Sequence, residues 1–291
     1  MREDAVTFAG KIAWVTGASS GIGEALARGL AARGAAIILS GRRIDALRRV
    51  ADEIGAASLP LPFEATDYEA LPQIVEAAQG WRGGVDCLIH CAGVSQRSLA
   101  VDTEFAVYRS LMEVDFFAPL RLTQLVLPAM VERRSGQIAI VSSVAGKIGL
   151  PLRTGYCAAK HACVGYFDAL RAEVETAYGI GVSVILPGSV RTNIAINALT
   201  ANGTQFGRTD ANIEKGMSAQ SAAEHIIAGL EAGKREILVA EGAELAATQT
   251  RAQNPEALFA TVAKEGARLA NLRETRGRGY PPEDSLVNDW S

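Results

Sequence analysis

Residues 11–34, KIAWVTGASSGIGEALARGLAARG, combine a short apolar segment, a glycine-rich turn and a helical pattern. KIAWVT is predicted to be a buried strand, and IGEALARGLAARG a helix that ends at Gly34. Between them, Gly17 allows a tight turn, Gly21 a close approach of the backbone to a ligand, and Gly23 close packing of the helix on the sheet. The free N–H groups of the helix N-terminus then face the phosphates of a dinucleotide. The alternative is a plain tight turn, but its position directly after an opening strand favours a phosphate site.

Strand and helix patterns continue to alternate along the chain, which predicts a parallel sheet covered on both faces. The expected strands after the first are AAIILS, SLPLPF, VDCLIH, QIAIVSS, GVSVILPG and REILVA. The expected helices include RIDALRRVADEI, TDYEALPQIVEAAQ and a long region from about Thr103 to Arg134. Another helix is expected after the sixth strand, near Ala219 to Ala232. We assign residues 1–240 to one dinucleotide-binding catalytic domain. Residues 241–291 form a C-terminal extension, predicted to be helical until about Leu272 and to end in a loose tail.

Composition excludes several classes of function. The chain has 291 residues, 48% of them hydrophobic and 21% charged, and its net charge of −3 makes a nucleic acid an unfavourable partner. We expect neither a membrane span nor a signal peptide, and hence a cytoplasmic protein. The four cysteines lack zinc-finger spacing, so reduced, buried thiols without a metal are expected.

The end of the second strand bears on the choice of cofactor. An acidic residue at this point would bind the adenosine ribose hydroxyls, whereas arginine accommodates a 2′-phosphate. Gly41 occupies the usual acidic position, and Arg42 and Arg43 follow it. A solvated pair of charges is the alternative, but the missing acid favours NADP(H) over NAD(H).

A second group of residues lies between Gln137 and Lys160. Ser143 ends the QIAIVSS strand, at the carboxyl edge where open α/β sheets bind ligands. Tyr156 and Lys160 follow on a predicted helix and, four residues apart, share one face. A nearby ammonium favours the phenolate, and a hydroxyl can hydrogen-bond a carbonyl oxygen as negative charge develops there. The three residues therefore predict general acid–base chemistry at a carbonyl group.

These landmarks, with CAG after the fourth strand and PG after the sixth, resemble the short-chain dehydrogenase/reductase family over residues 10–240. TNIAINALTANGTQFG and FDALRAEVE are similar to its member-7-like dehydrogenase/reductases, several of which carry an N-terminal membrane anchor that we do not expect here. The resemblance implies a doubly wound Rossmann-type α/β fold with seven parallel strands in the order 3-2-1-4-5-6-7, and a homodimer or homotetramer.

The resemblance also implies roles for individual residues. Tyr156 would be the acid/base and Ser143 would orient the carbonyl, while Lys160 would hold the nicotinamide ribose and lower the tyrosine pKa. The implied cofactor-binding set is Gly17, Ser19, Ser20, Gly21, Ile22, Gly23, Arg42, Arg43, Glu64, Ala65, Ala92, Gly93, Tyr156, Lys160, Pro187, Gly188, Val190 and Thr192.

The sequence departs from the family pattern in three places. His90 replaces an amide in the family's N-N-A-G, and we expect it to be a hydrogen-bonded structural residue. Glu64 replaces an aspartate of the adenine pocket, and Asp115 replaces the asparagine of the family's proton relay. Pro119 lacks an N–H for the Asp115 carbonyl, so a kink could turn that carbonyl towards a relay water near Lys160. The alternative, which we weight equally, is that the Asp115 carbonyl is solvated or accepts a hydrogen bond from another group.

The sequence thus predicts an NADP(H)-dependent oxidoreductase that interconverts an alcohol and a ketone or aldehyde on a small to medium, mostly apolar substrate. A catalytically impaired NADP(H)-binding regulatory protein is the alternative, because a carboxylate at Asp115 could pair with Lys160. A sugar-nucleotide epimerase is disfavoured by the short C-terminal part. We expect substrate recognition by residues 94–98, 150–155 and the segment 192–216, whose glycines predict a mobile lid.

Overall fold

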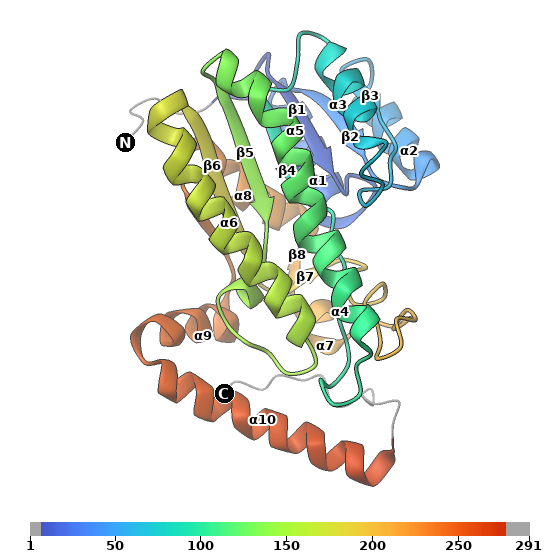
Figure 1. The fold of residues 1–291 in the computed structure, drawn as a ribbon, viewed down its shortest axis with the longest axis vertical. Coiled ribbons are helices and arrows are strands. Elements are labelled where there is room, and N and C mark those ends of the chain that lie inside the picture. Colours follow the sequence, from blue (N-terminus) through green and yellow to red (C-terminus); the bar gives the residue numbers. More distant parts are fainter. Residues whose placement is uncertain (1–6, 278–291) are drawn as a thin grey trace.

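A computed structural model describes residues 7–277 and contains a seven-stranded parallel sheet in the order β3-β2-β1-β4-β5-β6-β9 (Figure 1). Because β9 is the REILVA strand, the predicted order is confirmed. A separate pair of two-residue strands, β7 and β8, joins the start of the predicted lid to its end. The bounds are β1 Ile12–Thr16, β2 Ala36–Ser40, β3 Ser58–Pro60, β4 Cys87–His90, β5 Gly136–Val141, β6 Ile180–Pro187, β7 Val190–Arg191, β8 Met217–Ser218 and β9 Glu236–Val239.

The central strands are mostly apolar because helices cover both of their faces. Along β1, Ala13 and Val15 pack into one hydrophobic cluster, while Ile12 and Trp14 pack into another on the opposite face. Side chains of a strand alternate between faces, so one continuous apolar run supplies both clusters. The same division recurs in β2, β4 and β5, and it places the core in two layers around the sheet.

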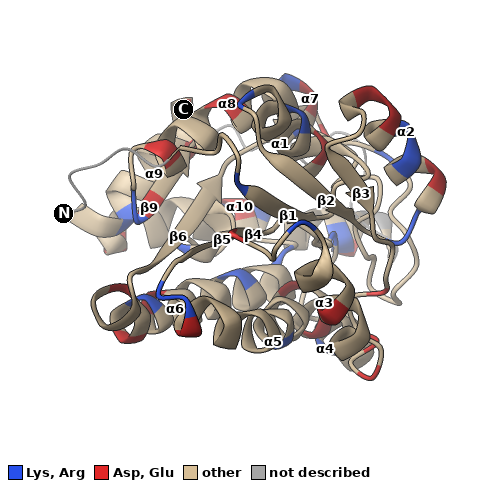
Figure 2. Cartoon of the chain, turned by 90° about the horizontal axis from the view of Figure 1, so that it is seen from above, with Lys and Arg blue, Asp and Glu red and all other residues tan. Residues whose placement is uncertain are grey.

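Figure 2 shows the two helical layers from above. One layer contains α1 (Gly21–Ala32), α2 (Ile44–Ile54) and α8 (Ala219–Glu231). The other contains α3 (Leu71–Gly80), α5 (Ala118–Glu132) and α6 (Thr154–Tyr178), with α4 (Phe105–Met112) leading into α5. The carboxyl ends of β5 and β6 lead into η2 (Val144–Gly146) and the β7 strand, and α7 (Ala211–Lys215) lies within the lid segment.

A π-helical turn, η1 (Glu113–Phe117), joins α4 to α5. Here the N–H of Ala118 bonds to the carbonyl of Glu113, five residues back. Pro119 follows directly and supplies no N–H, which accounts for the change from α-helical bonding. The combined helix Phe105–Glu132 is long and apolar enough by composition to cross a membrane. It packs against the sheet through residues such as Leu122 and Val126, as the core helix of a globular domain does.

The C-terminal extension is helical, as predicted, and forms two helices. They are α9 (Gly242–Gln253) and α10 (Pro255–Arg276), which lie below the sheet in Figure 1. The break follows from Asn254, whose side chain caps α10 at the Ala257 N–H, and from Pro255, which favours a helix start. The loose tail is predicted to begin at Arg276, but α10 extends through that residue. The part of the tail from Arg278 onward lies outside the described residues.

Candidate active site

Ser143 leaves β5 at the carboxyl edge of the sheet, where it caps the short helix η2. Its Oγ accepts the Ala145 N–H at 3.1 Å and donates to the carbonyl of Pro187 at 3.3 Å. The same hydroxyl acts to lower the pKa of Tyr156, so it lies beside the phenol. The structure thus brings together the serine and tyrosine that the sequence placed thirteen residues apart.

Gln96 holds the first turn of α6, which carries Tyr156. Its Oε1 accepts the Gly155 N–H at 2.7 Å and the Tyr156 N–H at 3.4 Å. The first N–H groups of a helix have no partner within the helix, and Arg153 at the N-cap position offers no side-chain bond. A buried glutamine from a distant loop satisfies them instead. Sequence reasoning missed this role, although Gln96 lies in the 94–98 segment assigned to substrate recognition.

Lys160 lies one turn after Tyr156 and is 4% exposed. Its ammonium donates to the Val141 carbonyl at 3.2 Å, lies 3.7 Å from Asp115 Oδ1, and is 5.6 Å from the centre of the Tyr156 ring. Burial acts to lower the pKa of Lys160, but the attraction of the Asp115 carboxylate, and of Tyr156 when it is ionised, outweighs burial, so the pKa of Lys160 is raised. Lys160 is therefore a permanent cation beside the phenol.

Tyr156 has a raised pKa, because burial of the phenolate outweighs the attraction of Lys160, and the charge of Asp115 adds to the rise. The sequence-based expectation was that Lys160 lowers this pKa. Lys160 does act in that direction, but burial is the larger effect in the protein alone. The tyrosine therefore carries its proton at neutral pH and can act as an acid.

Asp115 is buried on the η1 turn and faces the same site. Its Oδ1 accepts the Val94 N–H at 2.9 Å, and its backbone carbonyl accepts the Cys163 thiol at 3.0 Å. The carbonyl is thus bonded elsewhere rather than turned towards a water near Lys160, because Cys163 on α6 lies within reach of the widened turn. It is the carboxylate that faces the lysine. Burial raises the pKa of Asp115, and Lys160 opposes that rise.

The glycine-rich turn has the close contacts that a phosphate-binding turn requires. Gly17 has φ +67°, and a Cβ there would lie 2.8 Å from the Ala92 nitrogen. Gly21 has φ +58°, and a Cβ there would lie 2.9 Å from the Thr192 side chain. Three predicted cofactor segments therefore meet at the N-terminus of α1. A side chain at either glycine would fill the space against which the cofactor is expected to lie, so the residues present fit a dinucleotide.

The two arginines after β2 lie where the outer end of the cofactor groove is predicted. Arg43 donates to the hydroxyls of Ser19 and Ser20, both at 3.1 Å, which joins it to the glycine-rich turn. Arg42 is exposed and lies 3.8 Å from Glu64. Arg43 is thus positioned beside the phosphate-binding turn, whereas Arg42 is directed to the Glu64 side of the groove.

The remaining predicted cofactor residues are found at the same edge. Ala65 and Ala92 line a cavity of about 20 Å³ together with His90. A Cβ on Gly93 would lie 2.7 Å from Asp115 Oδ1 and 3.3 Å from Lys160 Nζ. His90 itself bonds Thr123 at 2.8 Å, which agrees with its expected structural role. Other members of the set lie in the turn after β1 or in the stretch after β6, namely Ile22, Gly23, Pro187, Gly188 and Val190.

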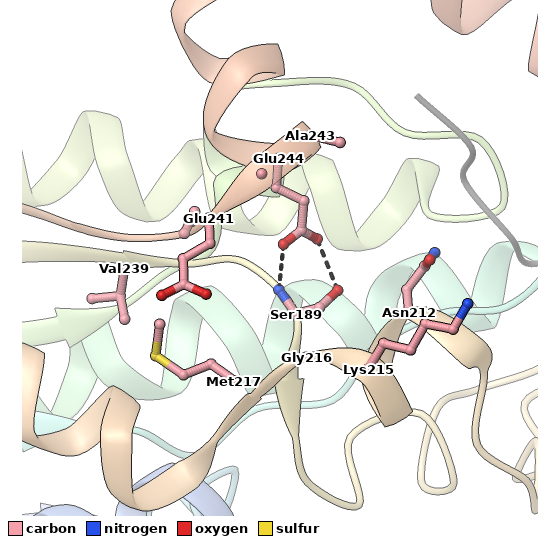
Figure 3. Close-up of a pocket in the computed structure, with 11 residues that line it drawn as sticks. Ser189, Asn212, Lys215, Gly216, Met217, Val239, Glu241, Ala243 and Glu244 are labelled. Carbon is pink, nitrogen blue, oxygen red and sulfur yellow. Dashed lines mark hydrogen bonds between the residues drawn. The ribbon is translucent and has the colours of Figure 1, made fainter. Parts of the chain in front are cut away.

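Glu244 is a residue that the sequence did not single out. From α9 it accepts the backbone N–H of Ser189 at 2.6 Å and the Ser189 hydroxyl at 2.8 Å (Figure 3). A Cβ on Gly188 would collide with its carboxylate. The C-terminal extension thus fixes the stretch after β6 that contributes Pro187, Gly188, Val190 and Thr192 to the predicted cofactor-binding set. Ser189 and Glu244 also border a cavity of about 520 Å³ between α9 and the end of the lid.

The predicted lid, residues 192–216, is anchored to the segment assigned to substrate recognition. Leu199 forms backbone bonds with Ser95 and Arg97, at 2.8 and 2.9 Å. Asp210 pairs with Arg97 at 2.7 Å in a fully buried contact, and Arg153 lies 3.9 Å from the same carboxylate. The lid therefore lies against the site rather than apart from it.

Helix α10 packs beside two of the three predicted substrate segments, 150–155 and 192–216. Leu258 shares a hydrophobic cluster with Ile148 and Ala247, and Leu269 contacts Leu152. Leu99 and Phe206 pack onto the second of these contacts. Apolar side chains from the C-terminal helix thus border the segments that are expected to meet the substrate.

A Rossmann sheet that carries this serine, tyrosine and lysine at its carboxyl edge defines the short-chain dehydrogenase/reductases, which are NAD(P)-dependent oxidoreductases. A family model described as short chain dehydrogenase matches residues 11–203. The chain belongs to this family.

Two relatives show which members of the family the chain resembles. Dehydrogenase/reductase SDR family member 7B of Bos taurus is 38% identical over 258 residues, covering 86% of this chain and 79% of that protein. Dehydrogenase/reductase SDR family member 7 of Homo sapiens is 44% identical over 201 residues, covering 67% and 59%. The expected resemblance to member-7-like proteins is confirmed.

A solved short chain dehydrogenase from Burkholderia cenocepacia J2315, in complex with NADP, has a similar fold. Its TM-score is 0.74 at 24% identity, over 88% of this chain and 99% of that one. A short chain dehydrogenase/reductase from Burkholderia phymatum, in complex with NAD, gives 0.73 at 23% identity, over 95% and 99%. These similarities support the fold. One of the two solved structures contains NADP and the other contains NAD.

Proposed function

We propose that the chain is an NADP(H)-dependent enzyme that interconverts an alcohol and a ketone or aldehyde on a small to medium, mostly apolar substrate. The observation that carries this is the convergence of Ser143, Tyr156 and Lys160 at the carboxyl edge of the sheet, beside the glycine-rich turn. The apolar side chains of Leu152, Phe206 and Leu269 support an apolar substrate. The bonds of Arg43 to the turn serines support a 2′-phosphate partner.

In carbonyl reduction the bound nicotinamide supplies the hydride. The chain orients the carbonyl oxygen with the Ser143 hydroxyl and protonates it with the Tyr156 hydroxyl. Lys160 stabilises the phenolate that this step leaves behind. Gln96 fixes the position of the tyrosine through the backbone of α6. NADPH oxidation with a panel of ketones and aldehydes tests the proposal, and binding of NADPH without turnover of any panel member would contradict it.

A specific observation favours the alternative of a catalytically impaired regulatory protein: Asp115 lies 3.7 Å from Lys160 and could weaken its hold on the phenolate. We expect the natural chain to be active, and Asp115→Asn to change kcat/KM by less than about tenfold, or 1.4 kcal/mol. Steady-state carbonyl reduction across pH, for both forms, measures this. A hundredfold rise in the asparagine variant would mean that Asp115 suppresses catalysis, and the regulatory function would then be preferred.

We further propose a cytoplasmic homodimer or homotetramer that acts on a small molecule and binds neither nucleic acid nor membrane. The four cysteines are free thiols, which fits a reducing compartment. Phe105 and Phe117 expose apolar surface on α4 and η1, which fits burial by a second subunit. Light scattering on the purified chain tests the assembly, and a monomer at micromolar concentration would contradict it.

A further inference from the structure

Arg97, Arg153 and Asp210 form a cluster of charges to which each of the three predicted substrate segments contributes one residue. Nη2 of Arg97 lies 2.7 Å from Oδ2 of Asp210, and Nη2 of Arg153 lies 3.9 Å from the same oxygen. The side chains of Arg97, Arg153 and Asp210 are 2%, 11% and 0% exposed. Because all three segments are expected to meet the substrate, this charge cluster borders the predicted substrate site.

The Asp210 carboxylate makes its hydrogen bonds without Arg153. Its Oδ2 accepts from Nε and Nη2 of Arg97 at 3.1 and 2.7 Å, and its Oδ1 accepts the Ile213 N–H at 3.1 Å. Arg97 also donates to the Ser95 hydroxyl at 2.9 Å. These bonds join the lid to the loop after β4 and give the Arg97–Asp210 pair a structural role. Arg153 adds no hydrogen bond to that pair.

Arg153 is a mostly buried cation whose donors are not used within the part of the chain that the structure describes. A guanidinium has five N–H donors, and no hydrogen bond from that of Arg153 is found among residues 7–277. Its 3.9 Å separation from Asp210 is longer than a hydrogen bond. Two guanidinium groups share one carboxylate, so the charge cluster has a formal charge of +1. Burial, and then the charge of Arg153, lowers the pKa of Arg97 to about 10, as expected where positive charge is in excess.

Arg153 lies near the tyrosine that is expected to protonate the carbonyl oxygen. It is the N-cap residue of α6, and Tyr156 follows three residues later, within the first turn. Arg97 is also close enough to Tyr156 for the charge of an ionised tyrosine to favour the charged form of Arg97. Leu152, the residue before Arg153, packs into the apolar cluster that α10 forms with the lid. The predicted substrate site therefore combines one cation and one apolar surface near the reacting hydroxyl.

We propose that Arg153 binds a carboxylate of the substrate, so that the chain interconverts keto acids and hydroxy acids whose remaining part is apolar. This inference rests on the proposed function and names the substrate class. The planar guanidinium matches a carboxylate with two parallel hydrogen bonds. A single negative charge balances the charge cluster, whereas a phosphate group, at about −1.5 to −2, would leave excess negative charge beside the oxygen on which charge develops. The carboxylate is therefore the acidic group that fits this site.

The experiment is steady-state NADPH oxidation with keto acids of different chain length, each compared with its methyl ester. The natural chain should have a higher kcat/KM for at least one acid than for its ester. Arg153→Met should lower kcat/KM for that acid by about 10- to 150-fold, mainly through KM, and change the value for the ester little. Arg153→Lys keeps the charge without the planar donors and should restore part of the loss. Arg109→Met, at an exposed arginine of α4, is the matched control and should change neither.

Inhibition of the natural chain supplies a second readout that does not depend on how the Arg153 variants fold. A carboxylic acid that has the same carbon chain but lacks the ketone should compete with the keto acid. Its amide should inhibit at least about tenfold more weakly, because the amide lacks the charge that Arg153 is proposed to bind.

Three results would overturn the carboxylate site. These are equal losses for acid and ester in Arg153→Met, no preference of the natural chain for any acid over its ester, and faster reduction of a phosphate-bearing ketone than of every keto acid. Turnover of esters or simple ketones in those cases leaves the oxidoreductase function intact. Binding of NADPH without oxidation by any compound overturns both proposals.

Discussion

Glu244 accepts hydrogen bonds from both the backbone N–H and the hydroxyl of Ser189, and so ties α9 to the stretch after β6. We predict that Glu244→Ala weakens NADPH binding by about 5- to 150-fold, because the loosened stretch must be ordered when the cofactor binds. The expected cost is about 1–3 kcal/mol, the range for lost hydrogen bonds to a charged group. Fluorescence titration measures this. Glu241→Gln is the control, since Glu241 borders the same cavity but is exposed. Equal losses in both variants would count against the Ser189 contact.

Cofactor choice is expected to depend on Arg42 and Arg43. We predict that NADPH binds at least tenfold more tightly than NADH, a difference of about 1.4 kcal/mol. Arg43→Ala should remove most of this difference, because Arg43 lies beside the serines of the phosphate-binding turn. Arg48→Ala, at an exposed arginine of α2, is the control. Comparable dissociation constants for the two cofactors, at one salt concentration, would refute the assignment.

Tyr156 is predicted to be the proton donor to the carbonyl oxygen. Tyr156→Phe keeps the ring but removes the proton, so kcat should fall by about 10² or more with NADPH affinity little changed. Lys160→Ala should reduce both turnover and NADPH affinity, because the lysine is expected to serve both. Steady-state kinetics and fluorescence titration separate the two effects. A phenylalanine variant that retains most of its activity would show that another group donates the proton.

His90 makes the stability of the fold depend on pH. Burial lowers its pKa to about 3 in the folded protein, whereas an unfolded histidine has a pKa of 6.5. The unfolded state therefore binds more protons below pH 6.5, and stability falls as pH decreases from there towards 3. At pH 5 the loss from this residue is about 2 kcal/mol.

His90→Asn removes this titration and introduces the amide found in the family pattern. Urea unfolding at pH 7 and pH 5 should show that the natural chain loses about 2 kcal/mol more than the variant. Similar losses in the two proteins would mean that His90 is already protonated, or is not buried, in the folded state.

The lid should be mobile at its tip but held at its ends. Gly203 and Gly207 lie in an exposed turn, whereas Asp210 is buried against Arg97. Without ligand we predict fast amide exchange, or high B-factors, over residues 200–209, and slowing when cofactor and substrate bind. A segment that is rigid in both free and bound forms would contradict the lid.

Breaking the anchor tests the same segment. Asp210→Asn leaves the buried Arg97 without its charged partner, which should destabilise the fold by about 3–5 kcal/mol. Asp168→Asn, at a half-exposed ion pair with Arg171, should cost less than about 1 kcal/mol. Thermal unfolding of the two variants makes the comparison.

The sequence by itself determined the fold and the candidate catalytic residues. The glycine turn after β1, the alternation of strands with helices, and the i, i+4 placement of Tyr156 and Lys160 are local patterns. Local spacing fixes which face of a helix a residue occupies, and parallel strands bring their carboxyl ends to one edge. Ser143, Tyr156 and the glycine turn could therefore be placed at a common site before any coordinates were known.

The tertiary structure decided the contacts between residues far apart in the chain. Gln96 accepts the Gly155 N–H at the start of α6, 59 residues away in the sequence. Glu244 accepts the Ser189 N–H from 55 residues away, and the Cys163 thiol donates to the Asp115 carbonyl, 48 residues away. No local periodicity encodes such pairs, because each depends on how two packed elements orient single side chains. The same holds for the raised pKa of Tyr156, since burial by distant segments outweighs the neighbouring lysine that the sequence made visible.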